Sequence, residues 1–424
     1  MTKSKPKNIL SPDQQLIAIY DAGKIGKFWD EHEEPFQTFN DLIFEGEGHT
    51  TFLKEIKSLY KKEKIILNTI SKKDFTKAVI TKLRALYDLE QPPSFVGLWQ
   101  SLRKELLDSP AMTLKVMREI HGIRLIHPDQ VLSLGPFKVY NFEAQHALLA
   151  TKSSPIPTDV FWADPLPAHL IEVEVVARDG NRAYEIADAY FERFERVLKF
   201  LVARPHEHFE VGVLSYTGPR LSRAYLFEGP RSGSNSGRTG PRQPLIIDDA
   251  FFQKHEIHRF FNLIVSEGNE LERRLMLAAD WVGQSYGDKS LPSSFLKAAI
   301  ALETLFTPQE NAIITPSILS SLSESLAILL ADTSEERLEI ERKVKKLYEK
   351  RSSITHSGNA DVDPNEIQLI QLIAREAILK IFTYENLSQL GSTQELARLI
   401  KMNKYAGPPL RVLSERTSEQ ARND

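Results

Sequence analysis

The 424-residue sequence contains no cysteine. Disulfide bonds, thiolate zinc sites, cysteine-ligated iron–sulfur clusters and a cysteine nucleophile are therefore excluded. Long apolar runs are also missing: one of the longest, 326–331, is far shorter than the roughly 20 apolar residues of a membrane span. The opening MTKSKPKNIL is basic but has no apolar stretch, so we expect no secretory signal there. These observations predict a soluble, cytoplasmic protein without a membrane span.

The sequence also lacks an excess of charge of either sign. Its 54 Lys and Arg residues and 57 Asp and Glu residues give a formal net charge of −3. This balance excludes a protein that coats a polyanion through its overall charge, so a nucleic-acid site would have to be local. The apolar fraction of 42% excludes an intrinsically disordered chain. At about 150 residues per domain, the length predicts two or three domains.

The pattern of apolar residues predicts a multidomain α+β protein. Residues 1–128 show helical spacing, for example from 51 to 87, and carry no catalytic signature. Residues 129–246 predict a small α/β domain with a mostly antiparallel sheet. Its predicted elements are two short strands within 131–142, a strand at 171–175, a helix at 183–202, and strands at 211–216 and 224–227.

The segment 229–243 is rich in Gly, Ser and Pro, which predicts a mobile loop at the end of the α/β domain. The neighbourhood 219–243 is basic, with only Glu228 as an acid, and its arginines are Arg220, Arg223, Arg231, Arg238 and Arg242. Such a segment could bind the phosphates of a nucleic acid. The alternative is a solvated loop between domains.

Residues 247–405 predict an all-helical bundle, followed by a loose tail at 406–424. Thr333 and Glu336 have the spacing of a capping box, and Asp363-Pro364 is a second helix start signal. The predicted helices are 249–266, 269–285, 294–306, 317–331, 335–355, 364–386 and a shorter one at 393–403.

Two charged residues coincide with apolar stripes of this bundle. Arg351 continues the stripe Ile340, Val344, Leu347 and Tyr348, and Glu303 lies beside the stripe of the helix 294–306. Because a buried charge is costly unless it is paired, we expect Glu303 and Arg351 to face one another. The alternative is that each lies at the edge of its stripe and reaches water.

His356 follows Arg351 by five residues and precedes Ser357-Gly358. A histidine at this place is often only a helix-capping group. However, the order of a helix at 295–306 (FLKAAIALETLF), a Ser-rich helix at 317–330 and the segment 347–358 (LYEKRSSITHSG) resembles the Apea-like branch of the HEPN (higher eukaryotes and prokaryotes nucleotide-binding) superfamily. The resemblance covers roughly residues 270–385, and no family is recognised in 1–246.

The resemblance implies a helical bundle that dimerises and acts as a metal-independent endoribonuclease, without a cofactor, in a toxin or antiviral defence context. It also implies that Arg351 and His356 are catalytic, with Glu303 as the acidic partner of the arginine. Many active members carry Asn, Asp or His directly after the arginine, where this sequence has Ser352 as a supporting polar group.

The implied chemistry is consistent with these residue types. A neutral histidine can remove the proton of the RNA 2′-hydroxyl, and an arginine can stabilise charge on the phosphate. One histidine does not readily serve as both base and acid, so a homodimer is expected. Two alternatives stay open: a non-catalytic HEPN module that binds nucleic acid or nucleotide or scaffolds an assembly, and a toxin restrained by its own N-terminal domains.

No metal site is predicted. His255 and His258 have the i, i+3 spacing of helical metal ligands, but no third ligand is evident nearby.

Overall fold

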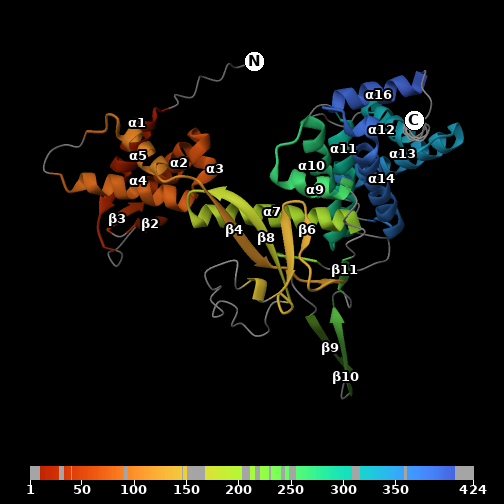
Figure 1. The fold of residues 1–424 in the computed structure, drawn as a ribbon, viewed down its shortest axis with the longest axis horizontal. Coiled ribbons are helices and arrows are strands. Elements are labelled where there is room, and N and C mark those ends of the chain that lie inside the picture. The colour runs from red at the N-terminus through yellow and green to blue at the C-terminus, as the bar shows by residue number, and fades with distance from the viewer. Residues whose placement is uncertain are drawn as a thin grey trace. The chain divides into compact units, whose positions relative to one another are not determined.

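The computed structural model describes most of the chain (Figure 1). The described residues are 10–27, 33–39, 41–89, 94–145, 147–149, 168–202, 211–214, 220–228, 231–239, 244–247, 255–307, 316–357 and 361–405. The chain forms two compact units, one of residues 1–116 with 174–188 and the other of residues 117–173 with 189–424. The expected tail at 406–424 lies outside the described residues.

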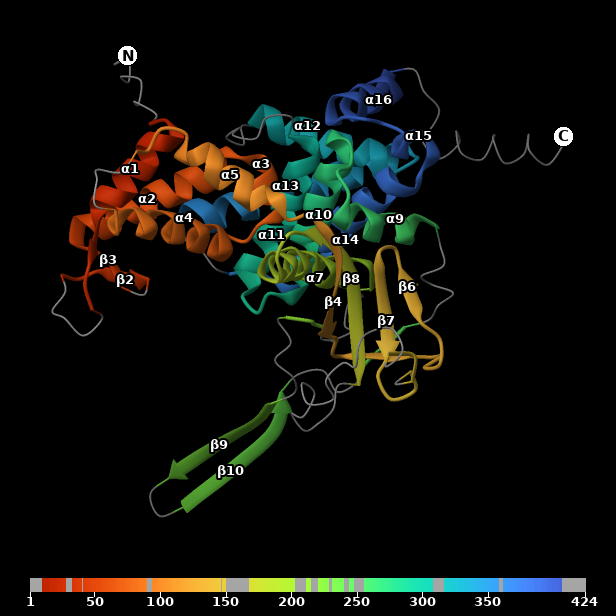
Figure 2. The same ribbon diagram turned by 60° about the vertical axis from the view of Figure 1, so that its left-hand side comes forward.

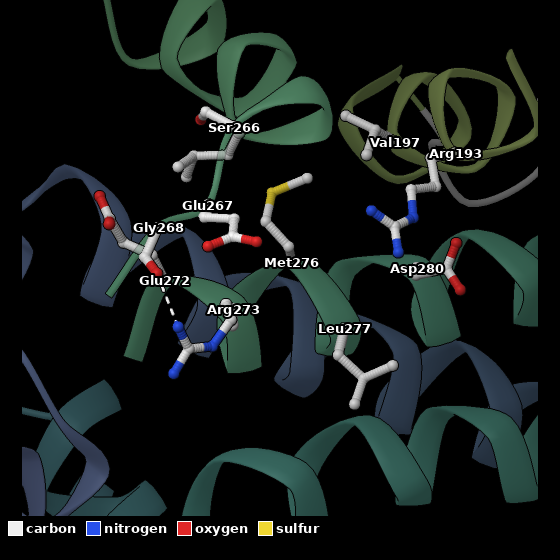
Figure 3. Close-up of a pocket in the computed structure, with 11 residues that line it drawn as sticks. Arg193, Val197, Ser266, Glu267, Gly268, Glu272, Arg273, Met276, Leu277 and Asp280 are labelled. Carbon is white, nitrogen blue, oxygen red and sulfur yellow. Dashed lines mark hydrogen bonds between the residues drawn. The ribbon is translucent and has the colours of Figure 1, made fainter. Parts of the chain in front are cut away.

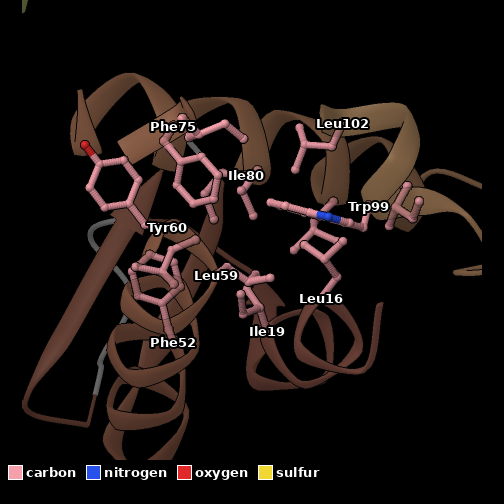
Figure 4. Packing of buried hydrophobic residues seen from close by; sticks show 14 of the residues in the cluster. Leu16, Ile19, Phe52, Leu59, Tyr60, Phe75, Ile80, Trp99 and Leu102 are labelled. Carbon is pink, nitrogen blue, oxygen red and sulfur yellow. The ribbon is translucent and has the colours of Figure 1, made fainter. Parts of the chain in front are cut away.

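In the described part of the first unit, the helices formed by residues 1–116 surround one apolar core. They are α1 (Pro12–Ala22), α2 (Gly46–Lys62), α3 (Lys64–Thr69), α4 (Lys72–Tyr87) and α5 (Leu98–Asp108). α1 begins with a capping box in which Ser11 and Gln14 satisfy each other's backbone amides, followed by Pro12 in the first turn. Figure 4 shows how α1, α2, α4 and α5 contribute to the core, with the Trp99 indole among aliphatic side chains.

The prediction of a helical region at 1–128 is confirmed only in part, because the region also contains strands. A three-stranded antiparallel sheet with the order β1-β3-β2 also lies in this region, formed by β1 (Gly23–Ile25), β2 (Phe36–Phe39) and β3 (Leu42–Glu45). Two more strands, β4 (Met112–Glu119) and β5 (Ile123–Leu125), precede residue 128. Strands of three or four residues show too few alternations to be detected from sequence, and their pairing partners are set by the tertiary structure.

A second sheet has the strand order β4-β8-β7-β6. The two strands predicted around Gly135 are β6 (Leu132–Leu134) and β7 (Phe137–Asn141), and they pair antiparallel. β8 (His169–Ala177) pairs antiparallel with β7, which confirms the strand predicted at 171–175. β5 and β11 (Leu245–Ile247) pair parallel. In place of the strand predicted at 211–216, the described part, 211–214, contains only a single bridge, at Gly212.

The prediction of a loop at 229–243 is also wrong over most of its length. β9 (Arg220–Glu228) and β10 (Arg231–Thr239) form a two-stranded antiparallel ribbon, which Figure 2 shows as a hairpin. Gly and Ser are poor strand formers, but ladder hydrogen bonds use backbone groups that every non-proline residue carries. Pairing with the more apolar strand β9 therefore orders a segment whose composition alone favours a loop. Residues 229–230 and 240–243 lie outside the described residues.

Aromatic side chains connect the sheet of the second unit to its helices. The helix α7 (Gly180–Val202) carries Phe194, whose ring lies 4.9 Å from the Phe137 ring of β7 and 5.3 Å from the Phe261 ring of α9 (His255–Val265), centroid to centroid. The Phe260 ring of α9 stacks at 3.7 Å on the Phe382 ring of α14 (Pro364–Thr383). β7, α7, α9 and α14 therefore share one core.

The C-terminal part of the chain is all helical, as predicted. Besides α9 and α14 it contains α10 (Glu270–Gly287), α11 (Leu291–Phe306), α12 (Pro316–Leu330), α13 (Ser334–Ser357), α15 (Glu385–Ser388) and α16 (Thr393–Tyr405). The capping box expected before α13 is present. The start signal at Asp363-Pro364 is confirmed as the beginning of α14, where Asp363 and Glu366 form a capping box. Within the described ranges, no helix is long and apolar enough to cross a membrane.

Candidate functional site

Glu303 on α11 and Arg351 on α13 face one another, as the sequence pattern predicted. Arg351 Nε donates to Glu303 Oε1 at 3.1 Å, and Arg351 Nη2 donates to Glu303 Oε2 at 3.4 Å. The guanidinium therefore contacts both carboxylate oxygens, with side-chain exposures of 23% for Arg351 and 17% for Glu303. One turn earlier, the hydroxyl of buried Tyr348 donates to the carbonyl oxygen of Ala299 at 3.3 Å. Two polar contacts, three residues apart on α13, thus join it to α11.

Burial dominates the electrostatics of this pair. Removal from water raises the pKa of the Glu303 carboxyl above its ordinary value of 4.5, although the charge and hydrogen bonds of Arg351 act in the opposite direction. Burial also raises the pKa of the Tyr348 phenol well above 10, and the nearby Glu303 charge adds to this effect. The site is therefore a low-dielectric environment. Within it, the positive charge of Arg351 favours the ionised form of Glu303.

His356 lies in the last turn of α13 and is exposed to solvent. α13 continues through Ser357, so no helix end separates the histidine from Arg351. Five residues of an α-helix turn through about 500°, which places the two residues about 140° apart around the axis. The described part of one chain therefore does not bring Arg351 and His356 together. Ser352 is exposed, and its carbonyl oxygen accepts a hydrogen bond from the Thr355 hydroxyl at 3.1 Å.

The structure places four of the five candidate phosphate-binding arginines on the hairpin: Arg220 and Arg223 on β9, and Arg231 and Arg238 on β10. Their side chains and all of Arg242 lie outside the described part of the structure.

Of the histidine pair His255 and His258, the structure describes only the His258 side chain. His258 Nδ1 accepts a hydrogen bond at 3.4 Å from the backbone N–H of Gly135, and the side chain of His255 lies outside what is described. Gly135 has a φ of +58°, and a Cβ there would lie 2.7 Å from the Asn262 side chain and 2.9 Å from that of Phe261. A glycine turn is therefore needed where β6 and β7 approach α9. Across the described ranges, no group of three or more His, Asp or Glu side chains is arranged to hold a metal ion.

Sequence analysis did not anticipate a cavity of about 370 Å³ between α7 and α10. Figure 3 shows Arg193 and Val197 of α7, Glu267 from the connection before α10, and Met276 and Leu277 of α10 around it. None of the predicted site residues lines this cavity. Its lining comes from distant segments and includes no motif, so the sequence holds no signal that could have located it.

Comparisons with protein-family models, with curated proteins and with solved structures gave no match to this chain.

Proposed function

We propose that the C-terminal helical region is a metal-independent endoribonuclease of the HEPN type that acts as a homodimer. The observation that carries this proposal is the placement of Arg351 and His356 on α13. The guanidinium is held by Glu303, and the imidazole is exposed at the end of the same helix. An oriented arginine and an accessible histidine are the two groups that cleavage through the RNA 2′-hydroxyl needs.

In the proposed reaction, neutral His356 removes the proton of the 2′-hydroxyl. The 2′-oxygen then forms a bond to the adjacent phosphorus, and the bond from phosphorus to the 5′-oxygen breaks. Arg351 stabilises the negative charge that develops on the phosphate oxygens. The leaving 5′-oxygen takes a proton from water, and His356 releases the proton that it removed to the solvent, so the products carry a 2′,3′-cyclic phosphate and a 5′-hydroxyl.

The separation of the two residues supports a dimeric site. Because they lie about 140° apart on one helix, a single copy of α13 does not direct both at the same phosphate. A second copy of the chain would supply the missing group to each site from its own α13. In the described residues, Nη1 of Arg351 carries no hydrogen bond, so it is available to a phosphate while Nε and Nη2 remain on Glu303.

The same ion pair favours a second function, a non-catalytic HEPN module that binds nucleic acid or scaffolds an assembly. The two bonds to Glu303 already give Arg351 a structural role, and Ser352 offers only an exposed hydroxyl where active members frequently have an amide, a carboxylate or an imidazole.

RNA cleavage in EDTA tests the proposal and separates it from the alternative. The experiment compares wild-type protein, His356→Ala and a matched control on the same RNA, and the product ends are mapped. The control is His127→Ala, which changes an exposed histidine remote from α13 in sequence. We expect cutting by wild type and by the control, with cyclic phosphate ends, and none by His356→Ala. Binding of RNA without cutting by any of the three proteins would support the non-catalytic module instead.

A further inference from the structure

The cations of α13 fall into three groups according to their partners. Four basic side chains have acidic partners: Lys343 with Glu339 at 2.5 Å, Lys345 with Glu341 at 2.5 Å, Lys350 with Glu366 at 3.3 Å, and Arg351 with Glu303 at 3.1 Å. Arg337 donates instead to the carbonyl oxygen of Ala331 at 3.1 Å. Arg342 and Lys346 are exposed and form no hydrogen bond or ion pair within the described parts of the chain. Arg342 does contribute to lowering the pKa of Glu339, but the larger cause is the hydrogen bond from Lys343.

Arg342 and Lys346 share a face of α13 with His356. At about 100° per residue, Lys346 and His356 each lie about 40° from Arg342 around the helix axis, on opposite sides of it, whereas Arg351 lies about 180° away. At about 1.5 Å per residue, the three residues span about 21 Å along the axis. Arg342 and Lys346 therefore lie on the His356 side of the helix and not on the side of the partly buried Glu303–Arg351 pair.

From this arrangement we infer that Arg342 and Lys346 bind the phosphate backbone of single-stranded RNA and direct the strand along α13 toward His356. The inference names the substrate-binding surface of the proposed nuclease and rests on that function for the role of His356. A cation that already has an acidic partner gains less from a phosphate, because the phosphate must compete with the carboxylate. The net charge of −3 makes such a local surface necessary for binding a polyanion.

One acidic residue on this face, Glu349, should oppose RNA binding. It lies between Lys346 and His356 on the same face, is exposed, and forms no ion pair in the described residues. A carboxylate at this place repels a phosphate backbone, so the path has one unfavourable charge whose removal should strengthen binding.

The test measures binding of a labelled polyuridine oligonucleotide to the full chain by fluorescence anisotropy, in EDTA and in the His356→Ala background so that the RNA stays intact. We expect Arg342→Gln with Lys346→Gln to weaken binding at least tenfold at low salt. The slope of log K against log salt should fall by about 1.4, since a single strand contributes about 0.7 for each phosphate contact. Glu349→Gln should strengthen binding.

The matched control is Lys343→Gln with Lys345→Gln, which removes the same two charges from the same helix at residues that have acidic partners. We expect it to change the affinity less than twofold. Three outcomes would overturn the inference. They are an equal loss of affinity in both double variants, no loss of affinity in either, and no RNA binding by the parent protein. Cleavage by the wild type together with normal binding by the Arg342/Lys346 variant would leave the nuclease proposal intact. Loss of binding in a protein that never cuts would keep the RNA surface and reject the nuclease.

Discussion

Glu303 and Arg351 are joined by two hydrogen bonds between α11 and α13, yet the pKa of the Glu303 carboxyl is raised and not lowered. The loss of water around a carboxyl that is only 17% exposed outweighs the attraction of the guanidinium. The pair is thus weak evidence for net stabilisation, but each partner depends strongly on the other. Two predictions follow from this relationship.

Replacing Arg351 by alanine should destabilise the protein. The change leaves the Glu303 charge buried without a partner, for which a loss of about 3 kcal/mol in the free energy of unfolding is typical. Urea denaturation followed by circular dichroism measures it. Arg342→Ala serves as the control, because this exposed arginine has no hydrogen bond or ion pair in the described residues, and its effect should stay within about 0.5 kcal/mol. An unchanged midpoint for Arg351→Ala would mean that Glu303 reaches water when its partner is lost.

The stability difference between wild type and Glu303→Gln should depend on pH in a defined direction. A carboxyl whose pKa is raised in the folded state binds a proton more tightly there than in the unfolded chain. The stabilisation from this tighter proton binding is present below the unfolded-state pKa of about 4.5. It is lost as pH rises through the higher folded-state pKa of Glu303. The variant should therefore gain stability relative to wild type as pH increases from 4 to about 7. The opposite slope would show that attraction to Arg351 exceeds the cost of burial.

Asp288 should show the reverse dependence on pH. Burial raises its pKa, but hydrogen bonds from Lys297, Ser293 and the Ser290 amide together overcome this effect and lower the pKa to about 2. The stabilisation is present above the unfolded value of 3.8 and is lost as pH falls through about 2. Asp288→Asn should therefore lower the unfolding free energy at pH 7 by at least about 1 kcal/mol, and the difference should shrink in acid. Thermal unfolding at several pH values measures it, and a constant difference would contradict the assignment.

Gly283 should tolerate no larger residue, because α10 contacts α7 there. A Cβ at Gly283 would lie 2.1 Å from the backbone oxygen of Arg196, whereas one at Gly287 would meet only the Lys199 Nζ at 3.7 Å. Gly283→Ala should cost about 1–3 kcal/mol through forced backbone shifts, and Gly287→Ala should cost less than about 0.5 kcal/mol. Chemical denaturation of the two variants provides the comparison. Equal stability of both would mean that the two helices can separate at little cost.

The helices could be anticipated from sequence much better than the strands. Every predicted helix from 183 onward has a counterpart, because amphipathic spacing and capping residues such as Asp363 act within one segment. The sequence does not predict the strands β1, β2 and β3 and favours a loop at β10, because pairing across the chain, and not local composition, decides where these strands form.

The sequence by itself determined the class of the C-terminal part and the meeting of Glu303 with Arg351. Both follow from local periodicity together with the high cost of an unpaired buried charge. Only the tertiary structure decided which cations of α13 have acidic partners, and that α13 extends past His356 and holds it away from Arg351. Those outcomes depend on where side chains from other helices lie and on where a helix ends, and neither is determined by the spacing of residues within one segment.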